Sequence, residues 1–449
     1  MKITKVGFKD FHQFKNIEID LTYPKGHKKE GEPLEKVCLI GQSGTGKTTL
    51  LKIIGGHTFT VGKLIEEYDS KKICENVYLC AKEKNLEVSI TIDINPKNQL
   101  QWYKWDSITE DGEKRDSLET YKKYEKYLNE IKNQFIYFPA ELKYDTYQKE
   151  TANLSSKNVI DFGDYNLGDV WNIVLNKIQE YQEAELKIRQ QVSKIVEDNS
   201  KDIEAIQRAV RKLERWRKKE FNPLAALANE CLDPLLKNFN LRVKRELDIQ
   251  KKEDLGFIKI EDLKGNPIPQ SLLSTGTKQV IFSAMPLYLL KPENALILFD
   301  EPERSLYPNI QKIIIEFYQS LTKDSQLIFA THSPIIASSF EPWEIIELKF
   351  NEKGEVYQEL YYKKELERHV NNYTIIPAYL TYDLMLNKVF DLRETYSQER
   401  SEKITEALML RNQLVVLKEK NKLETEQGKK LYEKYKDLAQ KLFWDFDIS

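Results

Sequence analysis

Short segments near the start of the chain alternate apolar with polar residues, a spacing that predicts β-strands with one buried face. They cover residues 2–8, 16–21, 76–81, 87–94 and 100–105. Other runs are apolar throughout and predict strands buried on both faces, at residues 37–40, 135–138, 295–299 and 326–330. The last two runs are bounded by helical segments, which is the order of a parallel sheet with helical crossovers.

Helical spacing dominates the middle and the end of the chain. Apolar residues recur at intervals of three and four from Val170 to Ile195, and the stripe resumes from Ile203 to Trp216 after a polar break at 197–200. The simplest interpretation is two antiparallel helices with a polar tip. Further helices are expected at 48–54, 118–131, 222–238, from 280 onward and at 401–446 with a break near 421, and further strands near 241–247, at 257–260 and after 341.

Composition adds two limits. The chain of 449 residues has 31% charged and 41% hydrophobic residues and a net charge of −2. Because its overall charge is slightly negative, binding to nucleic acid would require a local basic cluster such as residues 208–219. No apolar run approaches the roughly 20 residues of a membrane helix. The first residues lack the apolar core of a signal peptide. We therefore expect a cytoplasmic protein without a membrane partner.

A glycine-rich segment carries the clearest chemistry. Residues 41–48 read Gly-Gln-Ser-Gly-Thr-Gly-Lys-Thr and fit the phosphate-loop pattern between a predicted strand and a predicted helix. Glycines let the backbone N–H groups turn toward phosphates, and the start of the helix adds partial positive charge. Lys47 is expected to reach the β- and γ-phosphates of ATP, and Thr48 to ligate Mg²⁺. The expected ATP-binding residues are Gly41, Ser43, Gly44, Thr45, Gly46, Lys47, Thr48 and Thr49.

Two acidic residues, Asp300 and Glu301, follow the apolar run at 295–299, at the strand end where α/β sheets place their sites. Asp300 is expected to hold Mg²⁺, and Glu301 to polarise the attacking water. His332 follows the next predicted strand, so the sheet should bring it beside Glu301, where it could contact the γ-phosphate or orient the water. Glu301 and His332 are the predicted catalytic residues.

A second anion-binding helix start is expected at Ser274 and the backbone around Gly276. The same chain already supplies a phosphate cradle at Gly41. The second cradle is therefore expected to close over ATP that another subunit holds. Its residues are Leu273, Ser274, Thr275, Gly276 and Thr277.

The order of these motifs resembles the ATP-binding-cassette superfamily, specifically its RecF, RecN, SMC and OLD branch. Residues 41–49 are similar to its Walker A, 273–279 to its signature motif, 298–306 to its Walker B and D-loop, and 330–334 to its His switch. The resemblance implies an α/β ATPase head: a mixed sheet with the phosphate loop, an antiparallel β subdomain, an inserted antiparallel helical hairpin and a helical C-terminal tail. It also implies homodimers or higher homo-oligomers, joined through ATP-sandwich heads and helical segments.

The predicted organisation has four parts. They are the N-terminal half of the head at 1–141, a helical insertion at 142–264, the C-terminal half of the head at 265–350, and strands with a helical tail at 351–449. Two positions depart from the pattern. Ala140-Glu141 stand where the branch has its glutamine loop, and Tyr307 replaces a histidine in the segment 300–308.

Within the branch, the chain resembles ATPase subunits of bacterial anti-phage systems such as Septu and PARIS, through its size, its short hairpin and the tail around residues 380–392. Those subunits work beside a separately encoded nuclease, and this sequence has no TOPRIM-like or HNH-like constellation. The resemblance implies an ATPase that senses an invader, for example through a phage protein, and controls a partner effector, a TOPRIM-like or HNH nuclease. Two alternatives stay open. One is a RecF-like or SMC-like ATPase of DNA repair or chromosome maintenance that binds DNA, and the other is an ATP-stabilised scaffold with little turnover.

Overall fold

The computed structural model describes residues 2–11, 13–59, 77–83, 86–94, 100–108, 114–116, 135–144, 154, 159–198, 202–220, 222–245, 247, 257–360, 376–390, 392 and 397–444. For residues 9–11, 56–59 and the strands between 77 and 116 it describes the backbone alone. The predicted helix at 118–131 lies outside the described residues. The chain divides into two compact units, Met1–Tyr379 and Leu380–Ser449.

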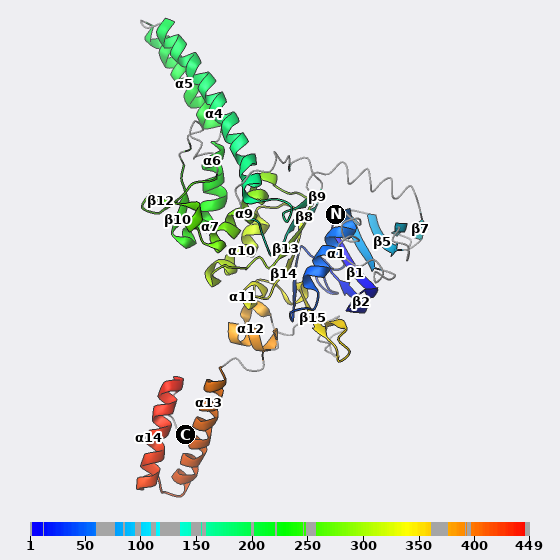
Figure 1. The fold of residues 1–449 in the computed structure, drawn as a ribbon, viewed down its shortest axis with the longest axis vertical. Coiled ribbons are helices and arrows are strands. Elements are labelled where there is room, and N and C mark those ends of the chain that lie inside the picture. The colour runs from blue at the N-terminus through cyan, green and yellow to red at the C-terminus, as the bar shows by residue number, and fades with distance from the viewer. Residues whose placement is uncertain are drawn as a thin grey trace. The chain divides into compact units, whose positions relative to one another are not determined.

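A mixed sheet, with 13 strands among the described residues, forms the frame of the first unit (Figure 1). Its order is β7-β6-β5-β4-β1-β2-β16-β15-β3-β14-β13-β8-β9. The strands are β1 (Lys2–Phe11), β2 (Phe14–Asp20), β3 (Lys36–Gly41), β4 (Val77–Glu83), β5 (Leu86–Ile94), β6 (Leu100–Ile108), β7 (Lys114–Asp116), β8 (Phe135–Phe138), β9 (Val159–Asp161), β13 (Leu296–Asp300), β14 (Gln326–Ala330), β15 (Ile345–Phe350) and β16 (Val356–Glu359). The run from β7 to β2 is antiparallel, whereas β3, β8, β13 and β14 are parallel.

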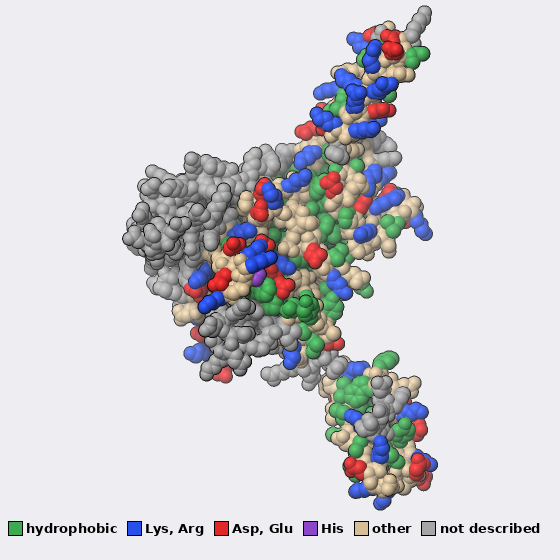
Figure 2. Space-filling model, turned by 180° about the vertical axis from the view of Figure 1, so that it is seen from behind, with side chains coloured by type: hydrophobic (Ala, Val, Ile, Leu, Met, Phe, Trp, Pro, Cys, Tyr) green, Lys and Arg blue, Asp and Glu red, His purple; other side chains and the backbone are tan. Residues whose placement is uncertain are grey.

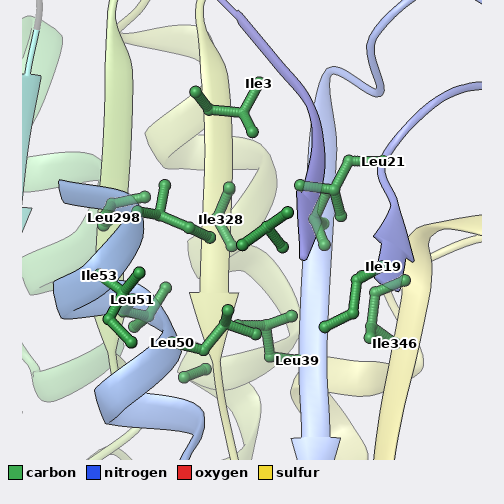
Figure 3. Close-up of a cluster of buried hydrophobic side chains, with 14 of the residues drawn as sticks. Ile3, Ile19, Leu21, Leu39, Leu50, Leu51, Ile53, Leu298, Ile328 and Ile346 are labelled. Carbon is green, nitrogen blue, oxygen red and sulfur yellow. The ribbon is translucent and has the colours of Figure 1, made fainter. Parts of the chain in front are cut away.

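Helix α1 (Lys47–Phe59) packs against β3, β8, β13 and β14. Its apolar side chains join those of the strands in one buried cluster (Figure 3). The cluster includes Leu39, Leu50, Leu51, Ile53, Leu298, Ile328 and Ile346. Full burial of such a side chain contributes roughly 1.5–3 kcal/mol, so the start of α1 is firmly held against the sheet.

Aromatic rings also pack along the parallel strands. Phe299 of β13 lies between Phe138 and Phe329, with ring centroids 4.9 and 4.8 Å apart, and Tyr318 stacks on Phe299 at 4.5 Å. Tyr318 belongs to α10 (Pro308–Ser320), and its hydroxyl is 2.6 Å from that of Ser283 in α9 (Thr275–Leu290). One hydroxyl pair therefore joins α9 to α10 beside this ring stack.

Helices α4 (Leu167–Asp198) and α5 (Ile203–Lys219) form the predicted antiparallel hairpin. Tyr181 packs on Trp216 with ring centroids 5.0 Å apart, and Glu185 pairs with Arg217 at 2.7 Å. Lys and Arg side chains are spread along the hairpin with Asp and Glu among them (Figure 2). Trp216 therefore belongs to the contact between the helices, as its place in the apolar stripe predicts.

The predicted helix at 222–238 is interrupted by a π-helical turn. Its parts are α6 (Pro223–Ala226), η2 (Leu227–Leu232), α7 (Asp233–Leu236) and a 3₁₀ turn, η3 (Lys237–Phe239). Asn222 caps the start, because its side chain accepts hydrogen bonds from the backbone N–H groups of Leu224 and Ala225.

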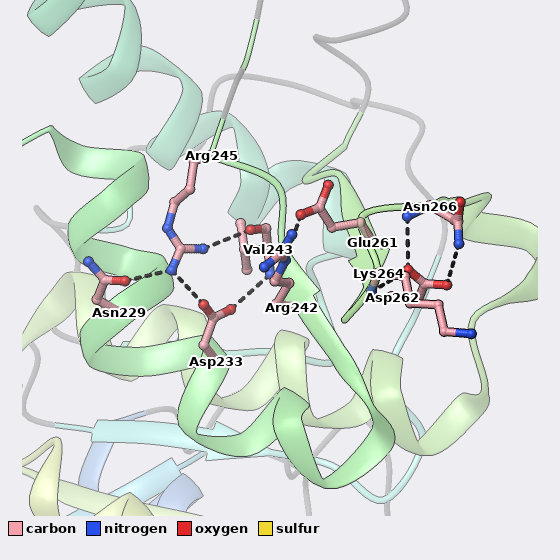
Figure 4. Close-up of polar contacts among 9 residues, drawn as sticks. All are labelled: Asn229, Asp233, Arg242, Val243, Arg245, Glu261, Asp262, Lys264 and Asn266. Atoms are coloured by element: carbon pink, nitrogen blue, oxygen red, sulfur yellow. Dashed lines mark hydrogen bonds and ion pairs between the residues drawn. The ribbon is translucent and has the colours of Figure 1, made fainter.

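The two strands predicted next differ from the structure in their bounds. A small antiparallel sheet contains β10 (Leu241–Val243), β11 (Ile260–Asp262) and β12 (Pro267–Ile268). Beyond β10, Arg245 turns back and donates to Val243 O, Asn229 Oδ1 and Asp233 Oδ2 (Figure 4). Asp233 Oδ1 also accepts from Val243 N. These side-chain contacts tie β10 to the helical segment, and the strand is shorter than its apolar pattern predicts.

The second unit is helical. It contains α12 (Tyr382–Lys388), α13 (Gln398–Glu419) and α14 (Glu426–Leu442). Helices α13 and α14 share a core made of Ala407, Leu410, Leu414, Tyr435, Leu438, Ala439 and Leu442. The predicted break near residue 421 is confirmed, since Asn421 has a φ of +52° between the two helices. No helix in the described part of the chain has the length and apolar character to cross a bilayer.

The predicted fold class is confirmed. The mixed α/β sheet carries the glycine loop between β3 and α1, the antiparallel strands lie at one end of the sheet order, and the hairpin and the helical tail are present. The four predicted domain boundaries stay predictions.

Candidate nucleotide-binding site

Three glycines shape the loop between β3 and α1. Gly41, Gly44 and Gly46 have φ values of +146°, +85° and +86°, a region that side chains rarely tolerate. A Cβ on Gly41 would lie 2.3 Å from Leu348 O, and one on Gly46 would lie 2.6 Å from the Phe14 ring. Both the conformation and the close neighbours therefore require glycine here.

The other loop residues differ in exposure. Thr45 is buried, and its hydroxyl donates to Gln42 O at 2.8 Å, so this side chain closes the loop on itself. Ser43 is exposed, and Thr49 is half-buried in the first turn of α1. Their predicted roles in binding ATP stay predictions.

Lys47 lies inside the loop and is only 6% exposed. Its Nζ donates to Gly41 O at 2.9 Å and to Gln42 O at 3.2 Å. Burial lowers the pKa of this ammonium group to about 8, against the opposing effect of Asp300 and Glu301. The Lys47 ammonium group can therefore replace its hydrogen bonds to these two carbonyl oxygens with hydrogen bonds to phosphate oxygens.

Thr48, in the first turn of α1, meets Asp300 at the end of β13. The Thr48 hydroxyl donates to Asp300 Oδ1 at 3.1 Å. Burial raises the pKa of the Asp300 carboxyl, and the hydrogen bond from Thr48 opposes that shift. A hydroxyl and a carboxylate oxygen side by side are the hard donors that Mg²⁺ prefers, so the pair fits a magnesium site.

Glu301 follows Asp300 in a left-handed conformation, with φ +47°. Its backbone N–H donates to Ala330 O at 2.8 Å, and its side chain stays 39% exposed. His332 Nε2 lies 3.9 Å from Glu301 Oε1, so the predicted closeness of these two residues is confirmed. Burial, followed by the charge of Lys47, lowers the pKa of His332, and Glu301 opposes this shift. A neutral imidazole therefore faces the carboxylate at neutral pH.

Glu303 is a residue that the sequence interpretation missed. Its Oε1 accepts hydrogen bonds from Thr331 Oγ1 at 2.6 Å and from the backbone N of His332 at 3.0 Å. Burial raises the pKa of its carboxyl. A third acid in the run Asp-Glu-Pro-Glu was the available signal, but its partner depends on the pairing of β13 with β14.

The predicted second cradle is the start of α9. Ser274 is the N-cap and is exposed; its Oγ accepts from Thr277 N at 3.1 Å and lies 2.8 Å from Thr277 Oγ1. Thr275 is exposed as well, and Leu273 is buried. A Cβ on Gly276 would lie 2.3 Å from Ser305 O, so the helix start packs tightly against the segment that follows Glu301.

The segment after β8, where the branch has its glutamine loop, is tied to neighbouring elements. Arg304 donates to Ala140 O at 3.2 Å and to Glu141 Oε1 at 3.3 Å. The Tyr144 hydroxyl donates to Gln279 Oε1 in α9. Glu141 is therefore in an ion pair with Arg304, and its side chain is exposed.

A family model described as "AAA domain, putative AbiEii toxin, Type IV TA system" matches residues 36–338, from the start of β3 to beyond His332. The chain belongs to this AAA family. Membership makes it a P-loop ATPase domain and implies nucleotide binding at the loop described above. None of the curated proteins is a match for the chain.

Solved structures of SMC heads are similar at low identity. The SMC head bound to the C-winged helix domain of ScpA is 14% identical, with a TM-score of 0.42, over 80% of this chain and 97% of that one. The head with an extended coiled coil, bound to the C-terminal domain of ScpA derived from Pyrococcus furiosus, is 14% identical, with a TM-score of 0.42, over 88% and 100%. The SMC head from Thermotoga maritima is 11% identical, with a TM-score of 0.39, over 80% and 98%.

Proposed function

We propose that this AAA-family chain binds ATP with Mg²⁺ and hydrolyses it. The observation that supports this is the meeting of three groups at one edge of the sheet: the Lys47 loop, the Thr48–Asp300 pair and the Glu301–His332 pair. Phosphoryl transfer needs a phosphate cradle, a magnesium ligand set and a group that orients the attacking water.

Each residue would act through a group described above. Backbone N–H groups of the loop and Lys47 would hold the phosphates, and Thr48 with Asp300 would hold Mg²⁺. The metal, when bound, neutralises charge that builds on the phosphate oxygens. Glu301 would take a proton from the attacking water, and His332 would orient that water or contact the γ-phosphate.

Phosphate release from the wild type and from Glu301→Gln tests the proposal. We expect the variant to bind ATP and to turn it over at least about 100-fold more slowly, since a general base contributes that much or more. Glu316→Gln, an exposed acid on α10, is the matched control and should keep the wild-type rate. A wild-type rate no greater than that of Glu301→Gln would instead favour the ATP-stabilised scaffold.

We further propose that Leu273 to Thr277 of a second copy complete the site. Ser274 and Thr275 stand exposed at the start of the 16-residue helix α9, which supports a role in binding an anion from outside the chain. Its first turn offers backbone N–H groups and partial positive charge in that direction.

The proposed role in the cell is control of a partner effector, a TOPRIM-like or HNH nuclease, in anti-phage defence, with a phage protein as the trigger. The family description, which names a type IV toxin–antitoxin system, supports a defence context. Co-purification with the products of neighbouring genes tests it. Neighbours without a nuclease or toxin, together with no captured partner, would contradict this role.

DNA binding, as in repair or chromosome maintenance, is the alternative. Arg211, Arg215 and Lys218 are exposed on α5 and supply cations for phosphate contacts. Reversing all three charges should weaken DNA binding if this surface is used. Unchanged DNA affinity would remove the hairpin from this role.

A further inference from the structure

We propose that Glu303 is a positioning residue that holds His332 beside Glu301 for ATP hydrolysis; the inference rests on the proposed function. Glu303 lies in the turn that follows Glu301. Its Oε1 accepts from the Thr331 hydroxyl at 2.6 Å and from the backbone N of His332 at 3.0 Å. The carboxyl group thus fixes the backbone of the residue whose ring lies 3.9 Å from Glu301.

The hydrogen bonds continue on the far side of His332. Ser333 N donates to Thr331 Oγ1 at 2.9 Å, and Ser333 Oγ donates to Gln311 Oε1 at 2.6 Å. Gln311 Nε2 donates in turn to Leu306 O at 2.8 Å. The segment 331–333 is therefore tied at both ends to the segment that carries Glu303, while the His332 side chain stays 40% exposed.

Stability alone does not explain a carboxyl group at this position. Glu303 Oε2 is buried and has no hydrogen-bond partner among the described residues. Leaving a buried polar atom unpaired costs free energy, and a residue selected for packing would avoid that cost. What the carboxyl group supplies is one acceptor oxygen for two donors of the His332 segment. That geometry serves the placement of the ring.

The decisive experiment is a double-mutant cycle between Glu303 and His332. We expect Glu303→Ala to lower kcat by about 100-fold, because small displacements of reacting groups have effects of this size, and to leave ATP affinity unchanged. His332→Ala should lower kcat similarly. The double variant should be no slower than the slower single variant, since His332→Ala removes the ring and Glu303→Ala releases the same ring from its place beside Glu301. Glu303→Gln keeps the Oε1 acceptor and should retain most of kcat.

Glu344→Ala is the matched control for loss of a buried carboxyl group. Glu344 Oε2 accepts from Glu341 N at 2.9 Å, and it precedes β15 at the end of that strand away from the glycine loop. This variant should lose stability and keep kcat. Multiplicative losses in the Glu303–His332 cycle, or a Glu303→Gln variant as slow as Glu303→Ala, would overturn the proposal.

The ring signal of His332 in NMR spectra gives a readout that needs no turnover. The chain has five histidines, so His332→Gln assigns the signal. In the nucleotide-free Glu303→Ala variant, the chemical shift of the His332 ring should move toward that of an exposed histidine. In Glu303→Gln this chemical shift should stay at its wild-type value. An unmoved signal in the alanine variant would contradict the inference. If the wild type does not hydrolyse ATP, the proposed function fails, and this signal still decides the positioning role.

Thr331 supplies a second pair of variants should Glu303→Ala not fold. Thr331→Val removes the hydroxyl that donates to Glu303 and should displace the His332 signal and lower kcat. Thr331→Ser keeps the hydroxyl and should match the wild type. Equal behaviour of the two Thr331 variants would count against the proposal.

Discussion

The hydroxyl of Thr48 donates a hydrogen bond to Asp300 over 3.1 Å, although 252 positions separate the two residues in the chain. The sheet order explains the contact. Strand β14 lies between β3 and β13, so α1 after β3 comes to rest beside the end of β13. The two oxygens that suit Mg²⁺ thus come from segments on either side of the hairpin of α4 and α5 in the chain.

Thr48→Val should reduce ATP hydrolysis by about 10- to 100-fold, the range seen when side chains around a metal ion are altered. Valine keeps the volume of threonine and removes the oxygen that faces Asp300. Thr48→Ser keeps the oxygen and should stay near the wild-type rate. The measurement is phosphate release against Mg²⁺ concentration, and a valine variant that follows the wild-type curve would rule out the magnesium role.

Mixing two inactive variants should restore activity if the second copy completes the site. Lys47→Ala damages the loop and Ser274→Arg damages the start of α9, so a mixed dimer holds one intact site and one doubly damaged site. In an equal mixture half of the dimers are mixed, and about a quarter of the wild-type rate is expected for a two-fold symmetric pair. A mixture as inactive as its components would argue against composite sites.

Gly276→Ala should destabilise the protein by about 1–3 kcal/mol, the usual cost of forcing atoms into a packed site. The added Cβ would lie 2.3 Å from Ser305 O, so the start of α9 or the segment after Glu301 must shift. Urea unfolding measures the loss. Thr275→Ala, at the neighbouring exposed position, is the control and should change stability by no more than about 0.5 kcal/mol.

Glu344 should make stability depend on pH. Burial raises the pKa of its carboxyl to about 7, against the opposing effect of Lys36, whereas the ordinary value is 4.5. Between pH 4.5 and pH 7 the unfolded chain releases this proton while the folded chain keeps it. Protonation of Glu344 therefore contributes fully to the free energy of unfolding below pH 4.5, and this contribution is lost as the pH rises to 7. The difference of about 2.5 pKa units corresponds to roughly 3 kcal/mol.

Glu344→Gln is neutral at every pH and should remove this dependence. Urea unfolding at several pH values from 4.5 to 7.5 is the test. The wild type should lose stability relative to the variant across this range, and parallel curves for the two proteins would show that Glu344 does not titrate as proposed.

The sequence alone predicts those parts of the site that lie within one short stretch of the chain. The phosphate loop has fixed spacing between a strand and a helix, and Asp300, Glu301 and His332 each follow a recognisable buried strand. Because neighbouring parallel strands end at the same edge, the closeness of Glu301 and His332 follows from the order of the strands. A local sequence pattern is therefore enough to predict the position of a functional side chain that follows a buried strand.

Other features depend on contacts that no local pattern records. Glu303 finds Thr331 only through the register of β13 against β14. The π-helical turn at Leu227–Leu232 keeps the apolar spacing of an ordinary helix, so its sequence predicts an uninterrupted one. Strand β10 ends at Val243, and Arg245 bonds back to Asp233, a residue 12 positions earlier in the chain that the local pattern does not point to.

The position of β3 between β14 and β15 has a consequence for synthesis on the ribosome. Both neighbours are made long after it, since β14 begins at Gln326 and β3 ends at Gly41. At a translation rate of about 5–20 residues per second, β14 is synthesised roughly 15–60 s after β3 and the glycine loop. A nascent chain that ends before Gln326 therefore has neither of the two strands that border β3 in the folded sheet.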